Sequence, residues 1–151
     1  MTAEVEKPGR EVVRQAVAVM LTALLTWVFS RFFIHRLSTP ILSSPVPLTL
    51  GEAVQLGLMV VLAWLIVGMS GPLRELYKTH MEKWEAASSV TSNLLKIPAL
   101  LVLYWAFEGI VVALLSLFIE PDLAQAFYEL FFLLVGIVIL YSLIKTVIRA
   151  L

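Results

Sequence analysis

The sequence contains no cysteine and only two histidines, His35 and His80, among its 151 residues. The lack of cysteine excludes disulfides, thiolate metal sites and cysteine nucleophiles. The two histidines fall on opposite sides of the bilayer predicted below, so they cannot share a metal ion. Phosphate-loop, dinucleotide-binding, zinc-protease and nucleophile-elbow motifs are also missing from the sequence. We therefore expect the protein to be neither an enzyme nor the carrier of a cofactor.

Charge is scarce as well. Charged residues make up 15% of the chain, against about 25% in soluble proteins, and 11 basic residues balance 11 acidic ones. A chain without net charge has no field that would attract nucleic acid, so we expect no nucleic-acid partner. Hydrophobic residues instead make up 60% of the chain, and the mean hydropathy is +0.94. This composition predicts an integral membrane protein surrounded by the lipid bilayer.

Four apolar runs are long enough to cross the hydrocarbon core, which takes about 20 helical residues. They are residues 16–34, 53–69, 97–119 and 123–144. The segment before the first run carries no net charge and no small-residue cleavage site follows it, which favours an uncleaved span over a signal peptide. Because the spans fill most of the chain, we expect a single integral membrane domain over residues 1–151.

Lysine and arginine are distributed unequally between the two ends of the predicted spans. The end that holds both termini carries most of them, namely Lys7, Arg10, Arg14, Arg74, Lys78, Lys83, Lys96, Lys145 and Arg149. The other end carries only Arg31 and Arg36, together with an acidic turn at Glu120 and Asp122. Because basic residues are retained on the cytoplasmic side, we expect both termini in the cytoplasm and the spans in the inner membrane or its equivalent.

Two connecting segments differ in character. Residues 37–51 contain several prolines and no charge until Glu52, which predicts an extended connector at the interface or a docking surface for a partner. Residues 72–88 follow the helix-breaking pair Gly71 and Pro72 and have one apolar face, which predicts an amphipathic cytoplasmic helix in the headgroup layer. Its predicted membrane-interface residues are Tyr77, Met81 and Trp84.

Ionisable residues inside the spans are the most informative feature, because each costs about 2.5–3.5 kcal/mol at the centre of a spanning helix. Glu108 lies roughly 18 Å along the helix from Glu120, at 1.5 Å per residue, close to the midplane. Arg31 and Glu129 share a shallower level, roughly 7–10 Å from the outer end. Gln55 and Gln125 lie near that level too.

These polar residues have two interpretations. In the structural one, Arg31 and Glu129 form an ion pair and the glutamines form hydrogen bonds between helices, which fixes the helix register. In the functional one, the carboxylates line a hydrated path in which Glu108 is the midplane site for an ion. The candidates for such an ion pathway are Glu108, Glu129, Arg31, Gln55 and Gln125.

Small residues also recur at helical spacing in three of the spans. Because small residues let membrane helices approach closely, they predict helix packing within one chain or between copies. The predicted packing residues are Ala18, Thr22, Thr26, Ser30, Ala53, Gly57, Gly109 and Ala113.

The sequence thus predicts an all-α membrane protein of four transmembrane helices, arranged as two helical hairpins with the amphipathic helix between them. Two functional hypotheses remain. The first is an oligomeric ion channel or transport-like pore, which would assemble as a homo-oligomer around the midplane carboxylate. The alternative is a non-catalytic accessory or scaffold subunit that binds other membrane subunits.

Overall fold

The computed structural model describes residues 2–42, 48–80, 82 and 84–151, and these residues are mostly α-helical. Its elements in chain order are α1 (Thr2–Val28), η1 (Phe29–Phe33), β1 (Pro40–Leu42), β2 (Leu48–Thr49), α2 (Leu50–Gly68), α3 (Ser70–His80), α4 (Trp84–Leu115) and α5 (Pro121–Ala150). Within the described residues, four helical segments are long and apolar enough to cross a membrane. The predicted all-α fold is confirmed, and the four long apolar helices support the predicted multi-pass membrane class.

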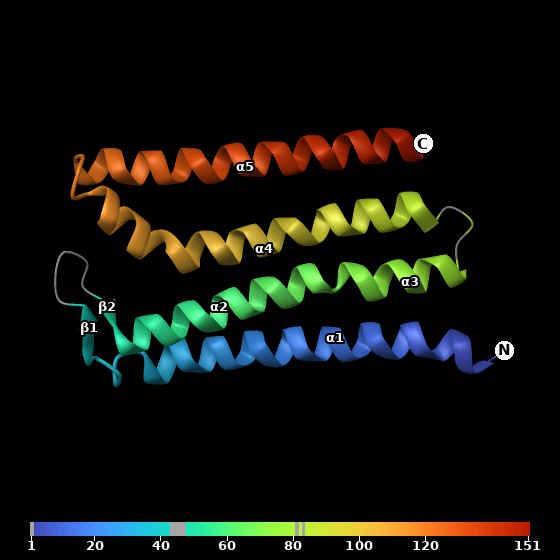
Figure 1. Ribbon diagram of the computed structural model, residues 1–151, viewed down its shortest axis with the longest axis horizontal. Helices are drawn as coiled ribbons and strands as arrows, with labels where there is room; N and C mark the ends of the chain where they lie inside the picture. The colour runs from blue at the N-terminus through green and yellow to red at the C-terminus, as the bar shows by residue number, and fades with distance from the viewer. Residues whose placement is uncertain (1, 43–47, 81, 83) are drawn as a thin grey trace.

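The helices lie side by side in one layer, in the order α1, then α2 with α3, then α4, then α5 (Figure 1). The helix α1 packs against α2 and α3, these two pack against α4, and α4 packs against α5. Both termini lie at the same end of the molecule, whereas the short strands and the turn between α4 and α5 lie at the other end (Figure 1). We call these the terminal end and the loop end.

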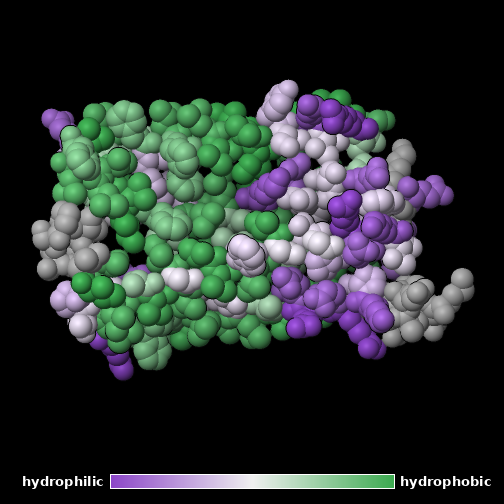
Figure 2. Space-filling model, in the orientation of Figure 1, coloured by the Kyte–Doolittle hydropathy of each residue, from purple (hydrophilic) through white to green (hydrophobic). Residues whose placement is uncertain are grey.

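The polarity of the surface changes along the length of the helices. Hydrophobic residues cover most of the length from the loop end, and hydrophilic residues gather at the terminal end (Figure 2). Large apolar side chains are exposed on this surface, with Trp64 at 79% and Phe118 at 85% exposure. A surface of this kind is stable only against lipid or against other apolar helices.

The buried core is correspondingly small. Its main cluster consists of Leu62, Ala63 and Ile66 of α2 packed against Ala99 of α4, and Ala124 and Tyr128 of α5 are buried apart from it. A single layer of helices leaves each helix in contact with its neighbours only, so most apolar side chains remain on the two faces of the layer. The core therefore fixes α2 against α4 at mid-length and leaves both faces of the layer open to the surroundings.

The connection between the first two long helices is closely held. The strands β1 and β2 pair antiparallel, and Gly51 donates its N–H to the carbonyl of Leu37 at 2.9 Å. Thr49 begins α2 with a capping box: its backbone N–H donates to the Glu52 carboxylate at 2.8 Å, and its hydroxyl accepts from the Glu52 N–H at 3.2 Å. Part of the predicted proline-rich connector, residues 43–47, lies outside the described residues.

The middle segment differs from the sequence prediction. A separate helix over residues 72–88 is not observed: α3 ends at His80, and Trp84 already belongs to α4. The chain runs from α2 into α3 after Met69 alone, whose N–H donates to the carbonyl of Leu65 at 3.2 Å. The break lies within a few residues of its predicted place, and Pro72 fits in the first turn of α3, where its missing N–H has no intrahelical partner.

Candidate functional site

The main polar group within the apolar part of the molecule lies between α4 and α5. The side-chain amide nitrogen of Gln125 donates to Glu108 Oε1 at 2.9 Å and to Glu129 Oε1 at 2.8 Å. The Tyr104 hydroxyl also donates to Glu108 Oε1, at 3.4 Å. We call Tyr104, Glu108, Gln125, Tyr128 and Glu129 the α4–α5 polar cluster. One amide group thus joins two carboxylates that come from neighbouring helices.

Tyr128 links α5 to the backbone of α4 through a hydrogen bond. Its hydroxyl donates to the carbonyl of Tyr104 at 2.5 Å, and its side chain is only 3% exposed. The rings of Tyr104, Tyr128 and Phe132 contact one another with centroids 4.9–5.3 Å apart. Ala124, one turn before Tyr128, is completely buried, so α4 and α5 approach closely here. These contacts hold the carboxylates in place rather than leaving them on mobile side chains.

The cluster opens toward the face of the layer. Glu129 is exposed and Glu108 is half-buried. Glu129 and Tyr104 also line an apolar cavity of about 700 Å³ that continues between the two helices past Gly136. The carboxylate of Glu129 is therefore directed to a region that lipid or another protein must cover.

Arg31 does not join the cluster. It lies in η1 and follows α1, at one edge of the layer, whereas Glu129 lies in α5 at the opposite edge (Figure 1). In the described part of the chain, the ion pairs join Arg14 to Glu11 and Lys78 to Glu75. The predicted pairing of Arg31 with Glu129 is therefore not formed within one chain, and neither carboxylate of the cluster meets a basic side chain among the described residues.

Gln55 lies in a separate groove on the other side of α4. This groove has a volume of about 480 Å³, and Ser30, Gly109 and Ala113 line it together with Gln55. The side-chain oxygen of Gln55 is buried and has no hydrogen-bond partner within the described residues. A Cβ atom built on Gly109 would meet nothing within 4 Å. The predicted packing residues Gly109 and Ala113 thus border open space.

The other predicted packing residues have mixed surroundings. Thr26 is buried and donates its hydroxyl to the carbonyl of Thr22 at 2.7 Å, which satisfies the hydroxyl within α1. Ala18 and Ala53 are half-buried, whereas Gly57 is exposed with nothing near a built Cβ atom. The small residues therefore do not form one continuous packing seam.

The predicted interface residues of the middle segment lie at the terminal end. The Tyr77 hydroxyl lies 3.1 Å from Thr91 Oγ1, which joins α3 to α4. The Trp84 ring lies under two cations, with Arg74 at 5.5 Å and Lys78 at 5.1 Å from its centroid. Met81 lies outside the described residues.

Sequence reasoning missed the role of the tyrosines. Tyr104 precedes Glu108 by one helical turn, and this spacing was a usable signal for their hydrogen bond. Tyr128 has no such signal, because its partner is a backbone carbonyl on another helix. Among the described residues, no group of three or more histidine, aspartate or glutamate side chains is placed to hold a metal ion.

No protein-family model, no curated protein and no solved structure matches this chain significantly. The function of the site is therefore inferred from its geometry.

Proposed function

We propose that the protein forms a homo-oligomeric pathway for cations across the membrane, with Glu108 and Glu129 as its cation-binding groups. The observation that carries this proposal is the pair of carboxylates joined by the Gln125 amide, with no basic side chain among the described residues to neutralise them. Two ionised carboxylates that share one amide donor repel each other strongly in a low-dielectric region. A proton or a monovalent cation bound between them removes that repulsion.

The single layer of helices supports an oligomer. One layer encloses no passage by itself, and Glu129 is directed to an exposed face. Several copies arranged around an axis would gather these carboxylates into a ring and shield them from lipid. Rings of acidic side chains are a common means of selecting cations.

The proposed orientation places the terminal end in the cytoplasm. The excess of lysine and arginine at that end supports it, since basic flanks are retained on the cytoplasmic side. In this arrangement α1 with α2 and α4 with α5 are two membrane-spanning hairpins in the inner membrane or its equivalent. The segment α3 then joins them on the cytoplasmic side.

A second function, that of an accessory subunit, is favoured by one observation. The buried side-chain oxygen of Gln55 has no donor in the part of the chain that the structure describes, and Gln55 lines the open groove beside Gly109. A helix of another membrane protein that carries a polar side chain would fit this groove and donate to Gln55. Such a subunit would leave the α4–α5 polar cluster with a purely structural role.

Flux through reconstituted protein tests the proposal. We expect purified protein in liposomes to conduct monovalent cations or protons, and we expect Glu108→Gln and Glu129→Gln to reduce this flux at least tenfold. Glu120→Gln is the matched control, because Glu120 is an exposed carboxylate in the turn before α5 with no side-chain capping bond. Equal flux in all three variants would refute the pathway. Copurification of other membrane subunits with no flux from the isolated chain would favour the accessory function.

A further inference from the structure

A polar cavity of about 540 Å³ lies at the terminal end, between α3, α4 and α5. Its lining combines two cations, Arg74 and Lys96, with several hydroxyl groups and one carboxylate, Glu85. The hydroxyl groups belong to Ser70, Ser88, Ser89, Ser92 and Thr146. Lysine, arginine and hydroxyl groups are the donors that bind phosphate oxygens. The cavity does not overlap the α4–α5 polar cluster, so its role is separate from the proposed cation pathway.

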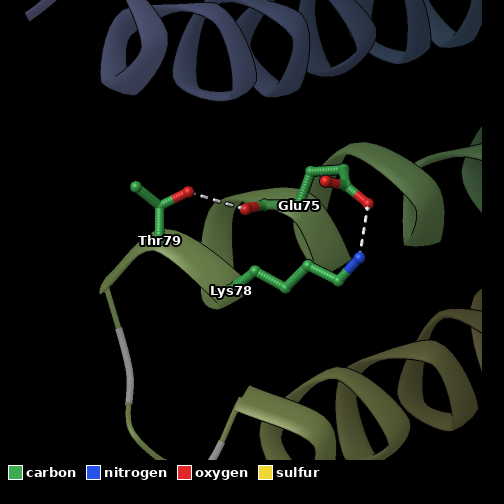
Figure 3. A network of polar contacts seen from close by, with 3 residues as sticks. All are labelled: Glu75, Lys78 and Thr79. Carbon is green, nitrogen blue, oxygen red and sulfur yellow. Dashed lines mark hydrogen bonds and ion pairs between the residues drawn. The ribbon is translucent and has the colours of Figure 1, made fainter. Parts of the chain in front are cut away.

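The basic side chains around this cavity differ in whether a carboxylate already neutralises them. Lys78 is held by Glu75, with Nζ 3.2 Å from the carboxylate oxygen, as Figure 3 shows. Arg74 has no carboxylate partner among the described residues and rests over the Trp84 ring, which holds the guanidinium at the cavity. Arg74 thus remains available for an anion, whereas Lys78 is already partly neutralised.

The second cation is positioned by hydrogen bonds from the cavity floor. Lys96 donates to the side-chain oxygen of Asn93 at 3.0 Å, and the Asn93 amide donates to Thr146 Oγ1 at 3.3 Å. Asn93 is 7% exposed, so this chain of contacts is largely shielded from solvent. An ammonium group has three donors, and the bond to Asn93 uses one of them. Lys96 therefore presents further donors at a fixed place.

An apolar groove adjoins the polar cavity at Ser70. It has a volume of about 560 Å³, and Ser70 lines both spaces. The groove follows α2 and α4 along the apolar part of the molecule and is lined by Ala63, Trp64, Val67 and Leu103. A ligand that fills both spaces needs a charged, phosphate-like head and a hydrocarbon chain.

We propose that these two spaces together bind one anionic phospholipid. Its phosphate lies between Arg74 and Lys96, with the serine hydroxyls as further donors, and one acyl chain lies in the groove along α2 and α4. The position suits this ligand, because the polar cavity adjoins the apolar groove at Ser70 and lies at the terminal end, where hydrophilic residues gather (Figure 2). Basic pockets between membrane helices commonly bind lipid headgroups. The nearby Glu85 limits the preference to a headgroup of modest negative charge.

Lipid binding to the detergent-solubilised protein tests this site. Native mass spectrometry with added phosphatidylglycerol is expected to show binding at least tenfold tighter than with phosphatidylcholine. The double variant Arg74→Gln and Lys96→Gln is expected to lose this preference. Arg36→Gln, which removes a positive charge at the loop end, is expected to retain it. An unchanged preference in the double variant, or equal binding of the two lipids by the natural protein, would overturn the proposal.

Two further measurements distinguish a bound lipid from bound inorganic phosphate. Val67→Trp fills the groove from an exposed position, and it is expected to weaken phosphatidylglycerol binding severalfold, whereas Val17→Trp on α1 leaves binding unchanged. Inorganic phosphate is expected to protect the protein against thermal unfolding far less than the lipid does. Equal protection by inorganic phosphate, or full lipid binding by Val67→Trp, would overturn the assignment of the site to a lipid.

Discussion

The helix α4 contacts α5 on one side and α2 with α3 on the other, and its contacts with α5 and with α2 are built differently. Toward α5 it is joined by hydrogen bonds from Tyr128 and Gln125, and Ala124 is fully buried against it. Toward α2, near the loop end, it borders a groove in which Gln55 has an unpaired oxygen and Gly109 faces open space. Near the loop end, the α5 side is therefore joined by hydrogen bonds within the chain. On the α2 side, Gln55 has no hydrogen-bond partner for its side-chain oxygen among the described residues, so the groove there is the place where another molecule would add contacts.

The largest expected effect on stability comes from replacing a small residue by leucine, and we compare one such residue at the α4–α5 contact with one beside the groove between α2 and α4. Ala124→Leu inserts a side chain where there is no room, and we expect it to lower the free energy of unfolding by about 3 kcal/mol. Gly109→Leu adds the same side chain next to the open groove and is expected to change it by less than about 1 kcal/mol. Reversible unfolding in mixed detergent, followed by circular dichroism, measures both. Similar losses for the two variants would contradict the difference between the interfaces.

A smaller effect on stability is expected when the Gln125 amide between α4 and α5 is removed. Gln125→Leu deletes the amide donor to Glu108 and Glu129 and leaves Glu108 with the Tyr104 hydroxyl as its remaining donor, so we expect a loss of about 2 kcal/mol in the free energy of unfolding. Gln125→Glu is a useful comparison, because it keeps the shape and adds a third carboxylate, and it should destabilise further. The same unfolding measurement applies. Full stability of Gln125→Leu would show that the hydrogen bonds to the carboxylates are not formed.

The smallest effect has the opposite sign. Gln55→Leu removes a buried oxygen that has no donor, and we expect the isolated chain to gain about 1 kcal/mol in the free energy of unfolding. If another membrane protein donates to Gln55, the same variant should weaken the complex while it stabilises the free chain. Pull-down from solubilised membranes beside the unfolding measurement separates these effects. A loss of stability in the isolated chain would mean that the Gln55 oxygen has a partner after all.

Much of the α4–α5 polar cluster could be predicted from the sequence. Gln125 and Glu129 are four residues apart and so share one helix face, and counting from the acidic turn places Glu108 at a depth that α5 can reach. Residue counting gives depth but not the lateral order of the helices. For this reason the predicted contact of Arg31 with Glu129 was wrong for a single chain: the two residues lie on opposite edges of the layer.

The sequence predicted the long apolar helices, but it did not predict where the helix between them ends. Long apolar runs identified the four helical segments that are long and apolar enough to cross a membrane, where each must satisfy its backbone hydrogen bonds internally. The end of α3 at His80 could not be read from apolar periodicity, since the pattern continues through Trp84 into α4. Gly71 and Pro72 predicted a break followed by a new helix, and α3 does begin close by, at Ser70, with both residues in its first turn.

A protein built as one layer has two unlike edges, and this restricts the symmetry of its assemblies. If copies meet through the same edge, α1 against α1 or α5 against α5, a twofold dimer results and leaves the remaining edge free. If copies meet head to tail, α5 of one copy against α1 of the next, the contact repeats until a ring closes. Head-to-tail closure places α5 of each copy beside α1 of the next, so every copy contributes both of its edges to the ring and no edge remains free.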